Sequence, residues 1–257
     1  MLIAGIVVLV VAVGLGVAAV LVRRRSDRLR GMEQLTCTEI AEQAKAAATA
    51  IGGGSFRKEV ATSGTLIPTG DLLTAPLSGT LCVWHRTIVR RRYEERNSSN
   101  NGTTTQTRVE HDASSQQRFG ISDGVTTVQL DPQRISVHDP ECTVNNYQPA
   151  GGFGDLLGGS LEIGGFRIDI GGGRGRTLGI ERVEYVLQPG LRLYAAGPVT
   201  DAGGTLVMGG RDGSTLTLSP RSVQEQAART AKAAAGLAIG AAVALLAAVV
   251  LLVLAVV

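Results

Sequence analysis

The chain has 257 residues, is 44% hydrophobic and carries a formal net charge of +3 at pH 7. Five arginines between residues 23 and 30 exceed this charge by themselves, so the composition gives no reason to expect nucleic-acid binding. The cysteines, Cys37, Cys82 and Cys142, are odd in number and scattered. This excludes the disulfide framework of a small secreted domain and predicts reduced thiols.

Two long apolar runs lie at the ends of the chain. Residues 2–22 contain no charge and no proline, and a helix rising about 1.5 Å per residue would cross roughly 30 Å, the thickness of a bilayer core. Positive charge follows this run, in Arg23, Arg24 and Arg25, which favours an uncleaved anchor over a signal peptide. Residues 233–257 form the second predicted transmembrane helix.

Both runs carry their cations on the side that faces the middle of the chain. By the positive-inside rule this predicts a multi-pass protein of the cell membrane, with a cytoplasmic domain and both termini outside. In the second run, Gly236 and Gly240 have the spacing that lets two helix backbones pack closely. Small residues are common in such spans, so an ordinary span composition is the alternative. The lipid bilayer is the predicted partner of these runs.

A short amphipathic helix is predicted over residues 36–50, between the first run and the middle domain. Thr36 and Glu39 have the spacing of a capping box, and the alanine-rich run that follows stops at Gly52. The apolar face, led by Ile40 and Ala44, is made mostly of alanine and would bury little area. We therefore expect this helix to pack on the domain or on the membrane surface.

From residue 55 onward the pattern is one of short strands and turns. Residues 80–89 hold the only tryptophan, Trp84, in a strand that is apolar on both faces at its start, which indicates a central, buried strand. Turn signals at residues 122–124 and 188–190 separate further strands. The other predicted strands cover residues 56–67, 104–110, 117–121, 125–130, 135–138, 182–187, 191–196, 205–208 and 214–218. Turns about every eight to twelve residues predict an antiparallel barrel or sandwich.

The predicted organisation is thus a membrane-anchored, mainly β protein with its soluble domain between two transmembrane helices. Residues 149–179 are too rich in glycine to specify a packed strand, and we interpret them as a flexible excursion with at most a loose hairpin. The predicted parts are the first transmembrane helix (1–22), a basic juxtamembrane segment with the short helix (23–54), the β domain (55–221), and a linker with the second transmembrane helix (222–257).

Three short motifs within the β domain stand in a distinctive order. They are A-P-L-S-G, with Pro76, Ser78 and Gly79; C-V-W, with Cys82 and Trp84; and E-Y-V-L-Q-P-G, with Pro189 and Gly190. With Gly64-Thr65-Leu66 before them, this order resembles the GIDE domain, which is similar to the membrane-embedded part of mitochondrial RING-type ubiquitin ligases. The resemblance covers residues 64–221 and implies a domain between two membrane helices. Only three of the 25 basic residues are lysine, which suits a bacterial form.

The sequence lacks the cysteine and histidine residues that the enzymatic RING part of that family needs. A RING binds two zinc ions through eight cysteine and histidine ligands, whereas three cysteines and three histidines are present here. We therefore predict a non-catalytic interaction or scaffolding module, with an unknown protein partner or a second copy, and with no catalytic residue, metal or cofactor. Ubiquitin-protein transferase activity, implied by the resemblance, is the alternative.

Two further groups of residues could carry chemistry. Cys82-x-x-His85 and His138-x-x-x-Cys142 have the inventory of a structural zinc site, but residues three apart on a strand face opposite ways, which favours a buried Cys82 beside Trp84. The other group consists of cations that could meet anionic lipid headgroups, at about 1 kcal/mol each. These are Arg23, Arg24 and Arg25 and, at the end of the main strand, Arg90, Arg91 and Arg92. For the latter three, a solvated strand end balanced by nearby glutamates is the alternative.

Overall fold

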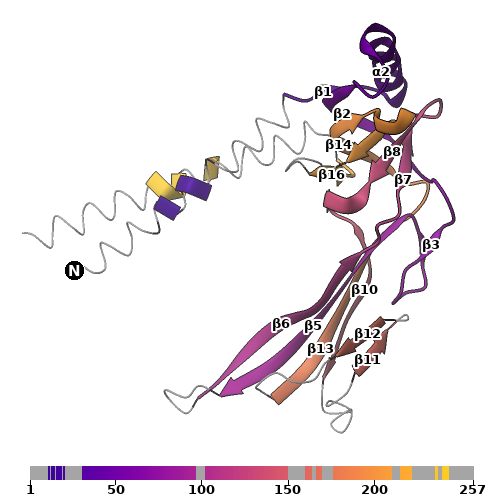
Figure 1. Cartoon of the computed structure of the whole chain (residues 1–257). Coiled ribbons are helices and arrows are strands. Elements are labelled where there is room, and N and C mark those ends of the chain that lie inside the picture. Colours follow the sequence, from indigo (N-terminus) through magenta and orange to yellow (C-terminus); the bar gives the residue numbers. More distant parts are fainter. Residues whose placement is uncertain are drawn as a thin grey trace, which may run out of the picture. The chain divides into compact units, whose positions relative to one another are not determined.

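A computed structural model describes residues 31–96, 102–149, 160–163, 166–169, 176–209 and 215–221, together with isolated helical residues between 11 and 20 and between 235 and 242 (Figure 1). The chain divides into two compact units. The first comprises Met1–Gln34, Glu59–Ala61 and Arg221–Val257, and the second Leu35–Lys58 and Thr62–Pro220. Within the first unit, strand β1 (Glu33–Gln34) pairs in parallel with Val60 and Ala61.

The prediction of two transmembrane helices is contradicted. A span needs about 20 consecutive apolar residues in one helix. Among the residues that the structure describes, no helix is both long enough and apolar enough to cross a membrane. This finding also contradicts the predicted membrane anchoring, the multi-pass localisation and the orientation derived from them. Most residues of the two apolar runs lie outside the described residues, as do Arg23, Arg24 and Arg25 after the first run.

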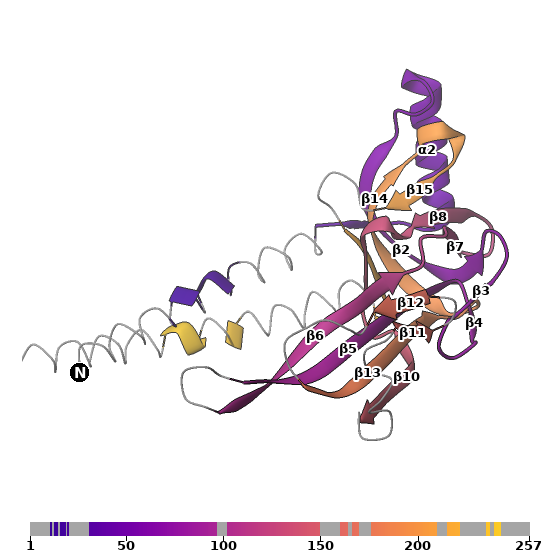
Figure 2. The same cartoon turned by 60° about the horizontal axis from the view of Figure 1, so that its bottom comes forward.

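The predicted short helix is confirmed as α2 (Cys37–Ile51). Its N-cap is Thr36, whose side chain accepts a hydrogen bond from the amide of Glu39, while the Glu39 carboxylate accepts one from the Thr36 amide at 2.7 Å. Ile40 and Ala44 are buried, so the narrow apolar face does contact the β domain. α2 lies beside β8 (Thr127–Asp131) in both views (Figures 1 and 2).

A closed ring of five strands forms the main body of the second unit. β2 pairs with β7, β7 with β8, β8 with β15, β15 with β14, and β14 returns to β2. β16 and β9 extend the sheet from β14. The bounds of these strands are Arg57–Pro68 for β2, Phe119–Ser122 for β7, Ile135–Val137 for β9, Arg192–Thr200 for β14, Val207–Gly209 for β15 and Leu216–Ser219 for β16. The predicted barrel is present, although β8 and β15 pair in parallel rather than antiparallel.

The alternation of apolar and polar residues explains why these strands close on themselves. Val128 and Leu130 on β8 are buried, and the residues on either side of each are less so. β7 contributes Phe119 and Ile121, and β15 contributes Met208, all at most 1% exposed. Because successive side chains of a strand point to opposite faces, these positions direct one face of each strand into a common core.

A second sheet of long antiparallel strands is joined to the barrel strands in sequence. Its order is β10 (Glu141–Pro149), β13 (Arg176–Leu187), β5 (Trp84–Arg96) and β6 (Thr103–Ser114). Figures 1 and 2 both show β5, β6 and β13 side by side. Two hairpins complete the described strands, β3 (Leu73–Thr74) with β4 (Leu81–Cys82), and β11 (Ser160–Ile163) with β12 (Phe166–Asp169). Short 3-10 helices cover Pro132–Arg134 and Ala202–Gly204.

Several strand predictions differ from the structure. The single strand expected at residues 80–89 is divided at Val83, because Leu81 and Cys82 pair with β3 while Trp84 begins β5. β5 then continues to Arg96, past the expected exit into solvent. β10 was not predicted at all, and β13 begins at Arg176, inside the segment interpreted as an excursion.

Candidate functional site

The A-P-L-S-G motif forms a closed loop between β3 and β4, which we call the motif loop (Ala75–Gly79). The amide of Gly79 donates to the carbonyl of Ala75 at 2.9 Å, and the amide of Ala75 donates to the carbonyl of Thr80 at 2.9 Å. Gly79 has a φ of +71°, in the left-handed region that side chains other than glycine rarely adopt. Pro76 supplies a fixed φ and has no amide hydrogen that would need a partner.

A buried carboxylate holds the motif loop in place. One oxygen of Glu184 on β13 accepts from the amide of Leu77 at 2.7 Å, and the other accepts from the amide of Ser78 at 3.0 Å. The hydroxyl of Thr143 adds a third hydrogen bond at 3.1 Å. Glu184 has no exposed surface, and a buried charge is tolerated only when such partners replace water. Glu184 therefore attaches the motif loop to the four-stranded sheet.

The motif cysteine lies in the apolar layer beneath this loop. Cys82 packs with Ala75 and Val186 in one buried cluster, and Leu73 covers it. Burial, assisted by the nearby negative charge of Glu184, raises the pKa of the Cys82 thiol to about 11. At neutral pH this residue is therefore a protonated thiol that packs as a small apolar side chain. Trp84, 3% exposed, follows at the start of β5.

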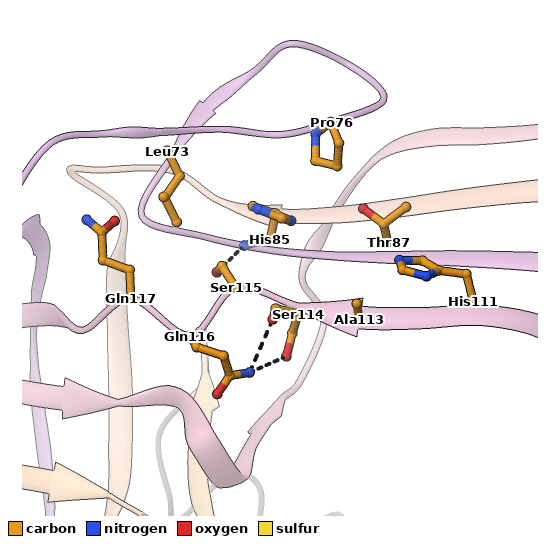
Figure 3. A pocket seen from close by; sticks show the side chains of 10 residues that line it. All are labelled: Leu73, Pro76, His85, Thr87, His111, Ala113, Ser114, Ser115, Gln116 and Gln117. Carbon is orange, nitrogen blue, oxygen red and sulfur yellow. Dashed lines mark hydrogen bonds between the residues drawn. The ribbon is translucent and has the colours of Figure 1, made fainter. Parts of the chain in front are cut away.

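A cleft of about 340 Å³ lies between the motif loop and the sheet, and we call it the β5–β6 cleft (Figure 3). Leu73 and Pro76 line it on the side of the loop. The sheet contributes His85 and Thr87 from β5 and His111 and Ala113 from β6, and residues 114–117 close it. In the strand register Thr87 lies opposite Ala113 on β6 and opposite Glu184 on β13. The cleft and the Glu184 side chain are therefore on the same face of the sheet.

The segment that closes the cleft is fixed by its own hydrogen bonds. The amide of Ser115 donates to the carbonyl of His85 at 2.9 Å, and the amide of His85 donates to the Ser115 hydroxyl at 3.1 Å. The side-chain amide of Gln116 donates to the carbonyl of Ser114 at 3.1 Å (Figure 3). The Ser115 hydroxyl is thus engaged by the main chain, and the residues lining the cleft include no carboxylate, thiol or ammonium group. The arrangement suits the binding of uncharged groups.

Two polar atoms of the cleft residues are buried without a hydrogen-bond partner among the described residues. They are Nδ1 of His85 and Oγ1 of Thr87. Burial lowers the pKa of the His85 imidazole, and the opposing effect of the Glu184 charge is the smaller of the two. His85 is therefore neutral at physiological pH. Neither residue's role was predicted from the sequence, where a threonine and a histidine in an apolar strand carry no distinctive signal.

The structure brings most of the motif residues together. Pro76, Ser78, Gly79 and Cys82 all belong to or adjoin the loop that Glu184 fastens. The Gln188-Pro189-Gly190 turn has a different role, because the amide of Gly190 donates to the carbonyl of Leu66 on β2 at 2.8 Å. The contribution of Glu184 was missed, although a glutamate within an apolar strand is a signal that could have revealed it.

The four residues considered for zinc are not gathered into one site. Cys82 is buried beside Val186, His85 lines the cleft, and Cys142 is exposed on β10. His138 follows β9, and its amide donates to the carbonyl of Leu218. Within the described part of the chain, no three histidine, cysteine or acidic side chains are grouped in a way that could hold a metal ion.

The three consecutive arginines of β5 are each engaged with side chains of the same sheet. Arg90 pairs with Glu181 at 3.2 Å, Arg91 pairs with Glu110 at 2.9 Å, and the guanidinium of Arg92 lies over the Tyr147 ring. The Arg91 side chain is only 5% exposed, which leaves Arg90 and Arg92 as the accessible cations of this group. The predicted helix-packing residues, Gly236 and Gly240, are helical, and a Cβ at either would meet nothing within 4 Å.

The fold defines a mainly β domain. It consists of a closed barrel and a four-stranded sheet, to which Glu184 attaches the motif loop. A family model described as GIDE, E3 ubiquitin ligase, matches residues 89–254, and the chain accordingly belongs to the GIDE family. The match includes Glu184 and the turn at Gly190 and begins after the motif loop. Neither a curated protein nor a solved structure matches the chain.

Proposed function

We propose that this GIDE domain is a non-catalytic protein-interaction module that binds an extended segment of a partner protein along β6. The observation that carries the proposal is the position of β6 at the end of the order β10-β13-β5-β6. β6 is twelve residues long, and all of residues 103–109 are exposed. A strand in this position offers main-chain donors and acceptors to an added strand, and the pockets beside it select the side chains.

The composition of β6 supports its use as a binding edge. Natural sheets commonly protect their edges with proline, lysine, bulges or inward-pointing charge. Residues 103–109 of β6 contain neither proline nor lysine, and the bulge and the paired acidic residues of β6 lie outside this stretch, at residues 110–112. Its acidic residues are turned toward the same sheet, where Glu110 pairs with Arg91 and Asp112 with Arg86. The register skips Glu110, which marks a bulge there and leaves residues 103–109 as one regular stretch. The opposite edge, β10, is irregular and ends in Pro149.

The alternative function is ubiquitin transfer, which the description of the family includes. A RING needs eight ligands, and the three cysteines and three histidines of this sequence cannot supply them. Zinc analysis of the purified chain separates the two possibilities. One or more equivalents of tightly bound zinc would favour the transferase, whereas the interaction module needs none.

The proposal is tested first by photo-crosslinking from the full-length chain in cells. A photoreactive side chain at Thr105, on β6, should capture a partner that the same group at Val125 does not capture. Val125 is 85% exposed and lies in the β7–β8 connection, which is not part of the four-stranded sheet, and this makes it a matched control. Capture of a second copy of the chain would show self-association instead, and equal capture from both positions would contradict the proposal.

A pair of proline substitutions then tests the strand pairing itself. Adjacent residues of an edge strand direct their amides alternately toward the neighbouring strand and away from it. Of the two variants Thr104→Pro and Thr105→Pro, one should therefore leave the β5–β6 pairing intact. That variant is identified by its unchanged melting temperature. That variant should lose the crosslinked partner, and retention of the partner at full affinity would overturn the proposal.

A further inference from the structure

We propose that the β5–β6 cleft is a binding pocket for an uncharged group with a ring-sized apolar body and one hydroxyl, of which a phenol is the simplest example. The pocket goes beyond the proposed function, because it is defined on the face of the sheet and needs no strand to be added to β6. Its volume of about 340 Å³ lies within the range of small-ligand pockets, roughly 300–1,000 Å³.

The apolar part of the ligand is specified by the walls of the cleft. Leu73 and Pro76 lie on one side and Ala113 on the other. Figure 3 shows the side chains of His85 and Thr87 pointing from β5 toward the same space that Leu73 and Pro76 face. A flat ring fits between such walls, because it places apolar faces against the aliphatic groups and an edge toward the polar atoms.

The polar part of the ligand is specified by the two atoms without partners. Thr87 is 4% exposed, and its Oγ1 has no hydrogen-bond partner among the described residues. The same holds for Nδ1 of His85 on the same face of β5. Buried polar atoms of native proteins nearly always have a partner, so these two atoms leave hydrogen-bonding capacity that a group bound in the cleft would satisfy. A hydroxyl can both donate and accept, and it can therefore satisfy both atoms.

Neither Glu184 nor His85 favours an ionic ligand in the cleft. The nearest buried carboxylate, Glu184, already accepts hydrogen bonds from Leu77, Ser78 and Thr143, so its oxygens are not free to bind a cation directly. Burial keeps the His85 imidazole neutral, so it does not attract an anion. An ion beside these two groups would lose hydration without gaining a direct ionic contact with either of them.

The test compares two probes of nearly equal size on the full-length chain, p-cresol and toluene, by ligand-observed NMR titration. The probes differ only in the hydroxyl, and p-cresol should bind about five- to tenfold more tightly than toluene, as expected for a net gain of one or two hydrogen bonds. Thr87→Val keeps the shape of the side chain and should bring this ratio close to one. Thr87→Ser should retain it, as should Thr105→Val, a matched control on the exposed part of β6.

The inference is overturned if neither probe binds, if both bind equally to the unmodified chain, or if Thr87→Val keeps the preference for p-cresol. Equal binding of both probes would mean that only water occupies the polar atoms, and a preference kept by Thr87→Val would mean that the hydroxyl does not bind Thr87. Circular dichroism would show whether Thr87→Val unfolds. In that case Thr87→Ser and His85→Phe are compared instead, because His85→Phe removes a polar atom of the cleft and Thr87→Ser does not.

The source of the bound group is distinguished by a third probe, a blocked Gly-Tyr-Gly peptide. Tighter binding of the peptide than of p-cresol supports a side chain of a protein partner, whereas binding of p-cresol alone supports a free small molecule. The proline variants of β6 should bind p-cresol like the unmodified chain. Failure of the pocket and failure of the strand pairing are therefore separate results.

Discussion

The carboxylate of Glu184 lies 2.7 Å from the main-chain nitrogen of Leu77, although 107 residues separate them in sequence. This contact joins two of the motifs by which the chain resembles its family, and it closes one side of the β5–β6 cleft by holding Pro76 above the sheet. The same carboxylate also accepts from Ser78 and Thr143. This one side chain therefore supplies the hydrogen bonds that tie Leu77 and Ser78 of the motif loop to β13.

Replacement of that carboxylate should loosen the loop and destabilise the domain. Glu184→Gln leaves one oxygen and directs an N–H₂ group at a main-chain donor, so we expect the free energy of unfolding to fall by about 2 kcal/mol or more. Urea unfolding followed by the fluorescence of Trp84, the only tryptophan, measures the change. Glu141→Gln, exposed on β10, is the control and should change stability little. An equal, small effect of both substitutions would show that the contact does not hold the loop.

The hydrogen bonds of Asp123 should make the attachment of α2 dependent on pH. Its carboxylate accepts from the amide and hydroxyl of Thr38, in the first turn of α2, and from the amides of Val125 and Thr126. These hydrogen bonds, led by that from Thr126, hold the pKa of Asp123 well below its usual value of 3.8. A depressed pKa in the folded state gives stability that is present above pH 4 and is lost as the pH falls further.

Asp123→Asn should accordingly cost about 1 kcal/mol at pH 7 and progressively less below pH 4. Urea unfolding at pH 7, 5 and 3 measures the difference from the unmodified chain. Asp71→Asn, at an exposed position, is the control. A difference that stays constant from pH 7 to pH 3 would contradict the role of the Asp123 charge.

The close approach of β2 to β7 should make substitution of Gly64 destabilising. A Cβ built on Gly64 would overlap the main-chain carbonyl group of Ser122, which cannot move aside like the end of a side chain. Gly64→Ala should therefore lower the free energy of unfolding by about 1–3 kcal/mol. Gly53→Ala, where a Cβ meets nothing within 4 Å, should be neutral in the same urea titration. Equal stability of the two variants would refute the close approach.

The three thiols should differ sharply in reactivity. Cys142 is exposed, whereas Cys37 and Cys82 are buried, and burial raises the pKa of both buried thiols. A maleimide reagent at pH 7 should modify one thiol rapidly in the folded chain and three in denaturant. Mass spectrometry of peptides should place the rapid modification on Cys142. Rapid modification of Cys82 in the folded chain would mean that the cluster with Ala75 and Val186 is open.

Local patterns in the sequence predicted the parts of the fold that local interactions stabilise. The capping box of Thr36 and Glu39 correctly marks the start of α2, because both hydrogen bonds join residues three apart. The turns at Gly124 and Gly190 are present, with positive φ values that glycine adopts without strain. Alternation likewise identified most barrel strands. Apolar length alone was misleading, since the two predicted spans are contradicted.

Tertiary structure alone decided which of these parts meet. The sequence by itself determined a mainly β chain with one capped helix and the motifs of the GIDE family, because each of those signals lies within a few neighbouring residues. The parallel pairing of β8 with β15, the division of the main strand at Val83 and the cleft around Thr87 depend on packing between distant segments. So does the contact of Glu184 with Leu77, because a buried carboxylate accepts whichever amides the fold brings to it.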